Sequence, residues 1–419
     1  MTRVVKRSPD PTRQRRLAGH YLRGSDSDVA RMQRTVSLAA RSLGFPIGQI
    51  NILDDRELSV VGDYGSGVTA VPRNESMCQF LIDDGVAVLA VDDLREHERY
   101  RFLPCVHQGV AVSYLGVALV SREASMIGSL CVADNRARHI TAGDIQRLAE
   151  FGEIVEDQLD LIRRNAETDA SREVSAMIAA ALDNDEIVPW YQPVVELSTD
   201  ARVAFEALAR WRRPDGSFVN PADFVGAAED SDLVVDLDRA VARAAIEDLA
   251  RWRRTEPSLQ VSVNLSTRHL ELPDGASYLV EAAEAARLDP SALVIEITET
   301  RMLSDVARAT ATVRELQDAG MRVLLDDFAN GWSSLDWLIG LGVNGIKLDR
   351  TVTTALGTRA GDAVCRAVVG MAADLDISTT IEGIEGAAHL LAAREHGFVY
   401  AQGYYWSAPV PAVVVDATI

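Results

Sequence analysis

The segment MRVLLDDFANGWSSL, residues 321–335, decides the fold predicted for the second half of this chain. Its apolar residues run straight into two adjacent carboxylates, Asp326 and Asp327, and then into Phe328 and an Asn-Gly pair. A short apolar run is typical of a strand that is buried on both faces, and Asn-Gly is typical of a turn. Two like charges at the end of a buried strand therefore require an explanation.

Short apolar runs of this kind recur eight times in the second half of the chain, separated by helical segments. They are IVPWYQPVVEL, RVAFEALARW, LQVSVNLS, ALVIEIT, MRVLLDDF, NGIKLD, STTIEGI and FVYAQGYYWS. Strands that are apolar on both faces and alternate with helices predict a mostly parallel sheet covered by helices. Eight of them in roughly 230 residues predict a closed α/β barrel of the TIM-barrel type.

Polar residues interrupt seven of these eight runs, mostly near the C-terminal end of the run. They are Glu206, Asn264, Glu296, Asp326, Asp327, Lys347, Glu382 and Gln402. The C-terminal ends of parallel barrel strands meet at one rim, where active sites are built. We therefore expect these side chains to converge at one end of the barrel.

Each of these residues also has an ordinary structural interpretation. A single glutamate such as Glu206 is more often a cap or part of a rim ion pair, and two adjacent aspartates are usually part of a turn. Asn264 could satisfy backbone groups, and Lys347 could pair with any nearby acid. Five carboxylates at one rim would nevertheless repel one another unless cations joined them. Taken together, the residues favour a metal site.

The types of ligand indicate which ion the site would hold. Carboxylate and amide oxygens without histidine or cysteine suit Mg²⁺ or Mn²⁺ rather than zinc. Adjacent aspartates, with acids from neighbouring strands, suit two ions roughly 3.5 to 4 Å apart, as in two-metal phosphoryl hydrolysis. On this hypothesis Asp326 bridges both ions, and Asp327 adds charge around one of them.

A series of motifs between about residues 180 and 410 supports this hypothesis. In order along the chain they are YQPVV, FEALARW, VNLS, IEITET, DDFANGWSSL, GIKLDR, IEGIE and QGYYWSAP. At these residues the chain resembles the EAL-domain phosphodiesterases that hydrolyse cyclic di-GMP. The resemblance implies a barrel whose first strand is antiparallel to the others, a homodimer, and hydrolysis of cyclic di-GMP to linear 5′-pGpG.

The resemblance also implies roles for individual residues. The first metal ion would be held by Glu206, Asn264, Glu296 and Asp326, and the second by Asp326, Asp327 and Glu382. Lys347 would orient the attacking water or neutralise the phosphate, and Gln402 would support water and substrate. Gln192 and Arg210 would contact the dinucleotide, and Glu299 would steady the loop after Asp327.

One departure from the family pattern leaves an alternative open. The family usually has Asp-Asp-Phe-Gly-Thr-Gly, whereas this chain has Ala329 and Asn330 before Gly331. In the family this loop couples the dimer interface to the metal ions. The alternative to an enzyme is therefore a catalytically weak receptor that binds cyclic di-GMP and signals through its helices.

The first part of the chain resembles a different family. Blocks such as FPIGQINILDD, VPRNESMCQFLI and IGSLCVADNRARHITAGDIQRL resemble a GAF domain, an α+β sensor fold. We predict a flexible basic tail over residues 1–24, a GAF-like domain over 25–164, a helical linker over 165–187 and the phosphodiesterase domain over 188–419. The ligand of the GAF-like domain is unknown.

Several side chains of the GAF-like domain could bind a ligand or react. They are Cys78, His97, Cys105, His107 and Cys131. They could ligate haem or report oxidation, but none sits in a recognisable ligand pattern, so we expect ordinary residues of the fold.

Composition limits the partners of the chain. The formal net charge of −20 over 419 residues argues against general affinity for nucleic acid polymers or anionic membranes. The longest apolar stretches fall short of the roughly 20 residues that a membrane span needs. Four cysteines without close spacing fit a reducing compartment, so a cytoplasmic location is expected.

Overall fold

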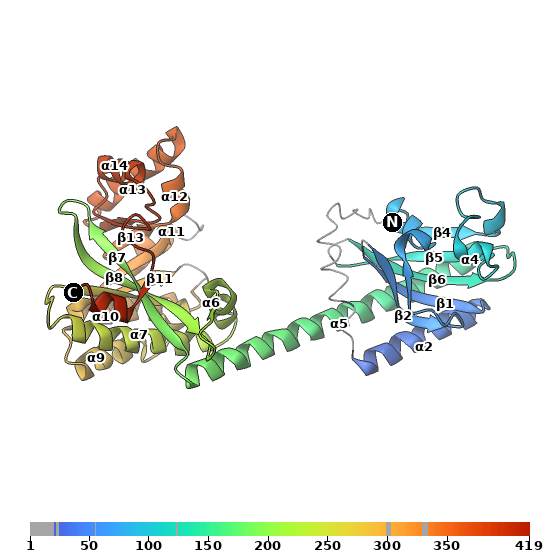
Figure 1. Ribbon diagram of the computed structural model, residues 1–419, viewed down its shortest axis with the longest axis horizontal. Coiled ribbons are helices and arrows are strands. Elements are labelled where there is room, and N and C mark those ends of the chain that lie inside the picture. The colour runs from blue at the N-terminus through green and yellow to red at the C-terminus, as the bar shows by residue number, and fades with distance from the viewer. Residues whose placement is uncertain (1–20, 22–24, 55, 123–124, 299–302, 329–333) are drawn as a thin grey trace. The chain divides into compact units, whose positions relative to one another are not determined.

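The computed structural model describes residues 21, 25–54, 56–122, 125–298, 303–328 and 334–419 (Figure 1). The basic tail predicted for residues 1–24 therefore lies outside the described residues, except for Tyr21. The chain divides into two compact units, Met1–Arg172 and Glu173–Ile419. The described part of the chain has no helix that is both long and apolar enough to cross a membrane.

The first unit is an α+β structure around a six-stranded sheet with the order β3-β2-β1-β6-β5-β4, in which every pairing is antiparallel. Its strands are β1 (Ile47–Leu53), β2 (Glu57–Tyr64), β3 (Ala70–Pro72), β4 (Val88–Val91), β5 (Ser113–Val120) and β6 (Met126–Asp134). Its helices are α2 (Asp26–Leu43), η1 (Arg73–Glu75), α3 (Gln79–Asp83), η2 (Leu94–Glu96), α4 (Pro104–His107) and the beginning of α5 (Ala142–Asp183). The GAF-like assignment and the predicted domain boundaries stay predictions.

Strand β6 lies inside this sheet and is buried along its whole length. Successive side chains of a strand point to opposite faces. Leu130 and Val132 accordingly join the core that contains residues of α2 and α5, whereas Cys131 and Ala133 join a second core on the other face. The sheet therefore carries an apolar layer on each face.

The second unit is a closed eight-stranded barrel. Its ring has the order β7-β15-β14-β13-β12-β11-β10-β8, and β8 closes it by pairing with β7. The strands are β7 (Ile187–Glu196), β8 (Ala201–Arg212), β10 (Gln260–Leu265), β11 (Leu293–Thr298), β12 (Arg322–Phe328), β13 (Gly345–Leu348), β14 (Ser378–Ile381) and β15 (Tyr400–Gln402). Strand β7 is antiparallel to both of its neighbours in the ring, and all the other ring pairings are parallel. The predicted TIM-barrel-like fold with one antiparallel strand is confirmed.

Helices alternate with the strands and pack outside the ring. They are α6 (Pro221–Glu229), α7 (Leu233–Trp252), α8 (Thr267–Leu270), α9 (Gly275–Ala285), η3 (Pro290–Ala292), α10 (Val306–Asp318), α11 (Ser334–Leu341), α12 (Arg350–Thr354), α13 (Arg359–Asp374), α14 (Ala387–His396) and α15 (Ala412–Asp416). Two short strands, β9 (Phe218–Val219) and β16 (Val410–Pro411), extend the sheet beside β8 and β7. Helices α7, α10 and α13 each pack against the parallel strand that follows them, β10, β12 and β14. This βα alternation places the C-terminal ends of the parallel strands at one rim.

Candidate active site

The barrel brings together polar residues that are far apart in the sequence. Glu206 lies on β8, Asn264 on β10, Glu296 on β11, Asp326 and Asp327 on β12, Lys347 on β13, Gln402 on β15, and Glu382 directly after β14. Glu206, Glu296, Lys347 and Gln402 are all buried. Each enters the site from a different strand, so the closed ring itself assembles the cluster.

Lys347 is the centre of this cluster. Its Nζ atom lies 2.6 Å from Glu382 Oε1 and 2.7 Å from Glu296 Oε2. The same atom lies 3.2 Å from Glu206 Oε2 and 3.5 Å from Asp326 Oδ1. One ammonium group, whose side chain is 1% exposed, is thus shared by four carboxylates.

Lysine is a rare residue in this chain. Lys6 and Lys347 are its only lysines, although lysine and arginine together number 42. A compact ammonium with three donors can be surrounded by acids from several directions, whereas guanidinium is planar and larger. The scarcity of lysine is a signal in the sequence that marks position 347.

Burial and charge shift the ionisation of the cluster in opposite directions. Burial disfavours the charged form of Lys347, but the surrounding carboxylates outweigh it and hold the pKa of Lys347 well above its usual value. Burial, followed by the charge of Glu206, raises the pKa of Glu296 well above its usual range. Burial also opposes charge on Glu206, yet Lys347 and two side-chain amides lower its pKa. An added cation would favour the ionised form of every carboxylate here.

The backbone of β12 is irregular at the two adjacent aspartates, where a register shift of the β-bulge type occurs. Strand β12 pairs with β13 through Leu324 and Leu325, and the register then shifts before Phe328. Asp327 has a φ of 53°, and its N–H donates a hydrogen bond to Asp326 Oδ1 at 3.0 Å. A non-glycine residue in this conformation costs about 1 kcal/mol or more, and such strain concentrates at functional sites. A bulge re-aims side chains that a regular strand would send to opposite faces.

The ionisation of Asp327 reflects the same crowding. Burial and then the charge of Asp326 raise the pKa of Asp327 to about 6. Asp349, two residues after Lys347, adds to this shift, and its side chain also caps α12 by accepting a hydrogen bond from the Thr351 N–H. Sequence reasoning did not single out Asp349. Its place in the run GIKLDR, directly after a barrel strand, was the available signal.

The oxygen atoms present fit a hard divalent cation. One carboxylate oxygen from each of Glu206, Glu296 and Asp326 lies within 4.8 Å of the other two. Asn264 donates its amide to Glu206 Oε1 at 3.0 Å, and its own Oδ1 is buried and accepts no hydrogen bond from the described residues. Carboxylate and amide oxygens of this kind are ligands of Mg²⁺ and Mn²⁺. The donor set therefore agrees with the predicted type of ion.

Two amides link this cluster to the antiparallel strand. Gln402 Nε2 donates to Glu206 Oε2 at 2.7 Å and to Gln192 Oε1 at 2.8 Å. Gln192, on β7, in turn donates to the Ser407 carbonyl at 3.1 Å. Gln192 and Gln402 thus form a hydrogen-bonded pair of amides that contacts the carboxylate of Glu206.

Arg210 lies further along β8, toward the rim. It is half-buried, and its guanidinium lies 5.8 Å from the centre of the Trp190 ring. Its Nη1 donates to the Ala209 carbonyl, and burial lowers the pKa of Arg210. Within the described residues it forms no ion pair with a carboxylate. A guanidinium in this setting is suited to bidentate binding of a phosphate.

The remaining predicted site residues lie outside the described residues. They are Glu299 and the Ala329-Asn330 pair. The roles predicted for them, in steadying the loop after Asp327 and in regulating the rate, stay predictions.

This fold and site define an α/β-barrel protein with an acidic cluster at the C-terminal rim of the barrel. The EAL domain family matches residues 175–409, and the chain belongs to this family.

Relatives of known name share this region. The chain is 30% identical over 237 residues to the cyclic di-GMP phosphodiesterase PdeR of Escherichia coli, covering 56% of this chain and 36% of PdeR. It is 35% identical over 226 residues to the cyclic di-GMP phosphodiesterase PA2567 of Pseudomonas aeruginosa, covering 52% and 38%. The chain thus spans little more than a third of the length of either relative.

A solved structure supports the barrel assignment. The phosphodiesterase PaMucR, in complex with c-di-GMP, is 26% identical and superposes with a TM-score of 0.54. The alignment covers 58% of this chain and 99% of that structure.

Proposed function

We propose that this chain hydrolyses cyclic di-GMP to the linear dinucleotide 5′-pGpG. The observation that carries the proposal is the buried ring of oxygen ligands around Lys347 in a barrel of the EAL domain family. PdeR and PA2567 are named as cyclic di-GMP phosphodiesterases, which supports cyclic di-GMP as the substrate. Hydrolysis adds water across one P–O3′ bond, leaving a 5′-phosphate on one guanosine and a free 3′-hydroxyl on the other.

We propose two Mg²⁺ or Mn²⁺ ions at this site. Glu206, Asn264, Glu296 and Asp326 would hold the first, and Asp326, Asp327 and Glu382 the second. Bound there, the ions would supply a nucleophile at neutral pH and stabilise negative charge on phosphate oxygens.

The other side chains would bind and orient the reactants. The Lys347 ammonium lies beside Glu206 and Glu382, which are proposed metal ligands. From there it would donate hydrogen bonds to the attacking water or to the phosphate. Gln402 would orient water and substrate through its Oε1, which is buried and accepts no hydrogen bond from the described part of the chain. Arg210 and Gln192 would hold the dinucleotide.

The test is a product assay on purified protein. Cyclic di-GMP is incubated with the chain in Mg²⁺, in Mn²⁺ or in EDTA, and nucleotides are separated by chromatography. We expect 5′-pGpG with either ion and none with EDTA. Tight binding of cyclic di-GMP without any product in either metal would favour the receptor function instead.

Glu206→Ala and Glu382→Ala should each abolish turnover to the same extent. The two residues are 176 positions apart, but both lie within 3.2 Å of Lys347 Nζ. Each single variant should lose nearly all turnover, and the double variant should be scarcely worse than either, because residues that act as one unit are not additive in rate. Steady-state kinetics of the three variants measure this, and defects that multiply would place the residues in separate sites.

Lysine at position 210 should weaken substrate binding more than chemistry. Arg210→Lys keeps the charge but loses the planar pair of donors, so KM should rise about tenfold while kcat changes little. Arg213→Lys, on an exposed residue just after β8, is the matched control and should leave both constants unchanged. A KM unchanged even in Arg210→Ala would remove Arg210 from the substrate site.

The first unit would act as a regulator. We propose that it is a GAF sensor domain and that the protein works as a homodimer, with α5 connecting the two units along the chain. Deleting residues before 173 should change turnover several-fold and remove its dependence on protein concentration. Identical kinetics with and without the first unit would contradict regulation.

A further inference from the structure

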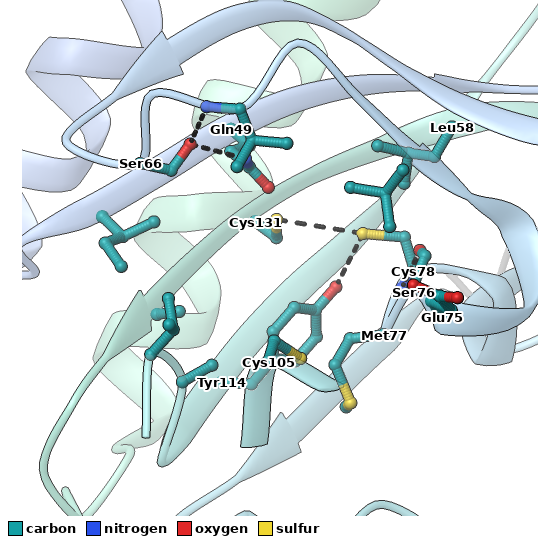
Figure 2. Close-up of a pocket in the computed structure, with 16 residues that line it drawn as sticks. Gln49, Leu58, Ser66, Glu75, Ser76, Met77, Cys78, Cys105, Tyr114 and Cys131 are labelled. Carbon is teal, nitrogen blue, oxygen red and sulfur yellow. Dashed lines mark hydrogen bonds between the residues drawn. The ribbon is translucent and has the colours of Figure 1, made fainter. Parts of the chain in front are cut away.

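The first unit contains a pocket that the proposed hydrolysis does not use. It has a volume of about 130 Å³ and lies on the face of the sheet that carries Cys131 (Figure 2). A single water molecule needs roughly 10–15 Å³ measured in this way, so the pocket has room for a small molecule. Three of the four cysteines of the chain, Cys78, Cys105 and Cys131, line this pocket.

Two of these cysteines are in direct contact. The Sγ atoms of Cys78 and Cys131 lie 3.9 Å apart, although the residues are 53 positions apart in the sequence. Cys78 stands directly before α3, and Cys131 lies within β6. Figure 2 shows the two sulfur atoms, joined by a dashed line, among the residues that line the pocket. A disulfide needs a separation of about 2.05 Å, so the sulfurs must approach by roughly 1.9 Å.

The surroundings of Cys78 favour its thiolate. Asn51 Nδ2 lies 3.3 Å from Cys78 Sγ and 3.4 Å from Cys131 Sγ. The Tyr114 hydroxyl lies 3.3 Å from Cys78 Sγ (Figure 2). The hydrogen bond with Cys131, stronger than the opposing effect of burial, lowers the pKa of the Cys78 thiol. The same contact, together with burial, raises the pKa of the Cys131 thiol well above its usual value. Cys78, whose sulfur also contacts the Tyr114 hydroxyl, is therefore the candidate nucleophile, and Cys131 is the neighbouring thiol.

The fourth cysteine provides the contrast. Cys365 is buried in α13 of the barrel, and burial raises the pKa of its thiol. Cys105 lies in α4 and is only partly buried, and burial raises its pKa as well. Cys78 and Cys131 differ from both of these cysteines because their sulfur atoms face each other beside the pocket, and the Tyr114 hydroxyl also contacts Cys78.

We propose that Cys78 and Cys131 form a peroxide-reactive dithiol that closes to a disulfide. The Cys78 thiolate attacks one oxygen of hydrogen peroxide and becomes a sulfenic acid, while the O–O bond breaks and hydroxide leaves. The sulfur of Cys131 then attacks the Cys78 sulfur, which expels the sulfenic oxygen as water with the proton of Cys131. Peroxide is reduced to two molecules of water, and two thiols are oxidised to one disulfide.

The test uses the reduced, full-length protein and hydrogen peroxide itself. The protein is exposed to a small molar excess of peroxide, unreacted thiols are alkylated, and the protein is digested with trypsin without reduction. The sequence places the cysteines on separate tryptic peptides, 74–95 for Cys78, 102–122 for Cys105, 123–136 for Cys131 and 360–366 for Cys365.

We expect peptides 74–95 and 123–136 joined by a disulfide, and a loss of two hydrogens in the intact mass measured before alkylation. Cys78 should lose its free thiol at least tenfold faster than Cys365 in the same sample. Oxidation of Cys78 no faster than that of Cys365 would overturn the proposal, and so would a disulfide that contains Cys105.

Three variants assign the steps to residues. Cys131→Ser should stop the reaction at a sulfenic acid on Cys78 that dimedone traps, and Cys78→Ser should slow peroxide consumption at least tenfold. Cys105 lines the same pocket, so Cys105→Ser is the matched control, and we expect it to react at the wild-type rate. Wild-type rates in Cys78→Ser would contradict the assignment. The peptide map of the wild-type protein decides the question even where a variant fails to fold.

Discussion

Asp326→Asn should lower the turnover of cyclic di-GMP by about a thousandfold or more, because an amide cannot bridge two cations as a carboxylate does. The Asp326 carboxylate lies in the oxygen cluster with Glu206 and Glu296 and within 3.5 Å of Lys347 Nζ. Binding of cyclic di-GMP should survive in part through Gln192 and Arg210. Steady-state kinetics in saturating Mn²⁺ measure the turnover, and calorimetric titrations with cyclic di-GMP and with Mn²⁺ measure the binding of each.

A matched control separates this effect from a general loss of negative charge. Asp318→Asn makes the same chemical change on an exposed residue at the end of α10, and it should leave turnover and Mn²⁺ affinity unchanged. If Asp326→Asn kept its turnover within tenfold of the wild-type value, Asp326 would not belong to the metal site, and the two-ion hypothesis would lose its bridging ligand.

Lys347→Met should destabilise the barrel strongly in the absence of divalent ions. Methionine keeps an unbranched, flexible side chain of similar length but leaves four carboxylates without the ammonium they share. Removing one partner of a buried ion pair costs about 3–5 kcal/mol. Thermal unfolding in EDTA at pH 8 measures this, and Mg²⁺ should raise the melting temperature of the variant more than that of the wild type.

The pH dependence of this loss has a definite sign. Burial already raises the pKa of Glu296 and of Glu382 in the folded protein, and removing Lys347 would raise both further. An acid whose pKa is higher in the folded state binds more protons there, so stability falls as the pH rises above the unfolded value of about 4.3. The deficit of Lys347→Met should therefore be larger at pH 8 than at pH 5.

A second methionine variant tests whether position matters more than charge. Arg322 lies at the start of β12 in the same barrel, bonded to Ser378 Oγ at 2.7 Å. Arg322→Met also removes a cation but strands no carboxylate cluster, so it should cost less than half as much stability. Equal stability of Lys347→Met and wild type in EDTA at pH 8 would show that the four acids do not depend on Lys347.

The sequence predicted the barrel, and it predicted that polar residues near the strand ends would lie close together. The reason is that a parallel barrel converts position along a strand into position in space, so acids near strand ends converge without any knowledge of packing. Glu206, Asn264 and Glu296 lie on neighbouring strands of the confirmed ring. The roles assigned to individual ligands were carried over from a family resemblance, and they stay proposals.

Other features depend on contacts that no local pattern encodes. The four-way contact of Lys347 is formed by β8, β11, β12 and the end of β14, and each of these segments alone predicts an ordinary ion pair. The positive φ of Asp327 follows from a register shift against β13, which the apolar pattern of β12 does not reveal. The contact between Cys78 and Cys131 depends on the fold of an antiparallel sheet, and sequence spacing led us to expect ordinary cysteines there.

The reversed direction of β7 determines where the chain enters the barrel. Ile187, its first residue, pairs with Trp211 near the C-terminal end of β8, and Glu186 just before it accepts a hydrogen bond from the Trp211 ring. A parallel first strand would have started at the opposite end, away from the acidic cluster. Helix α5 ends at Asp183, only a few residues before this point. If the first unit regulates the site as proposed, any twist or pull transmitted along that helix would reach the rim that carries the acidic cluster through the strand that holds Gln192, and need not travel through the core.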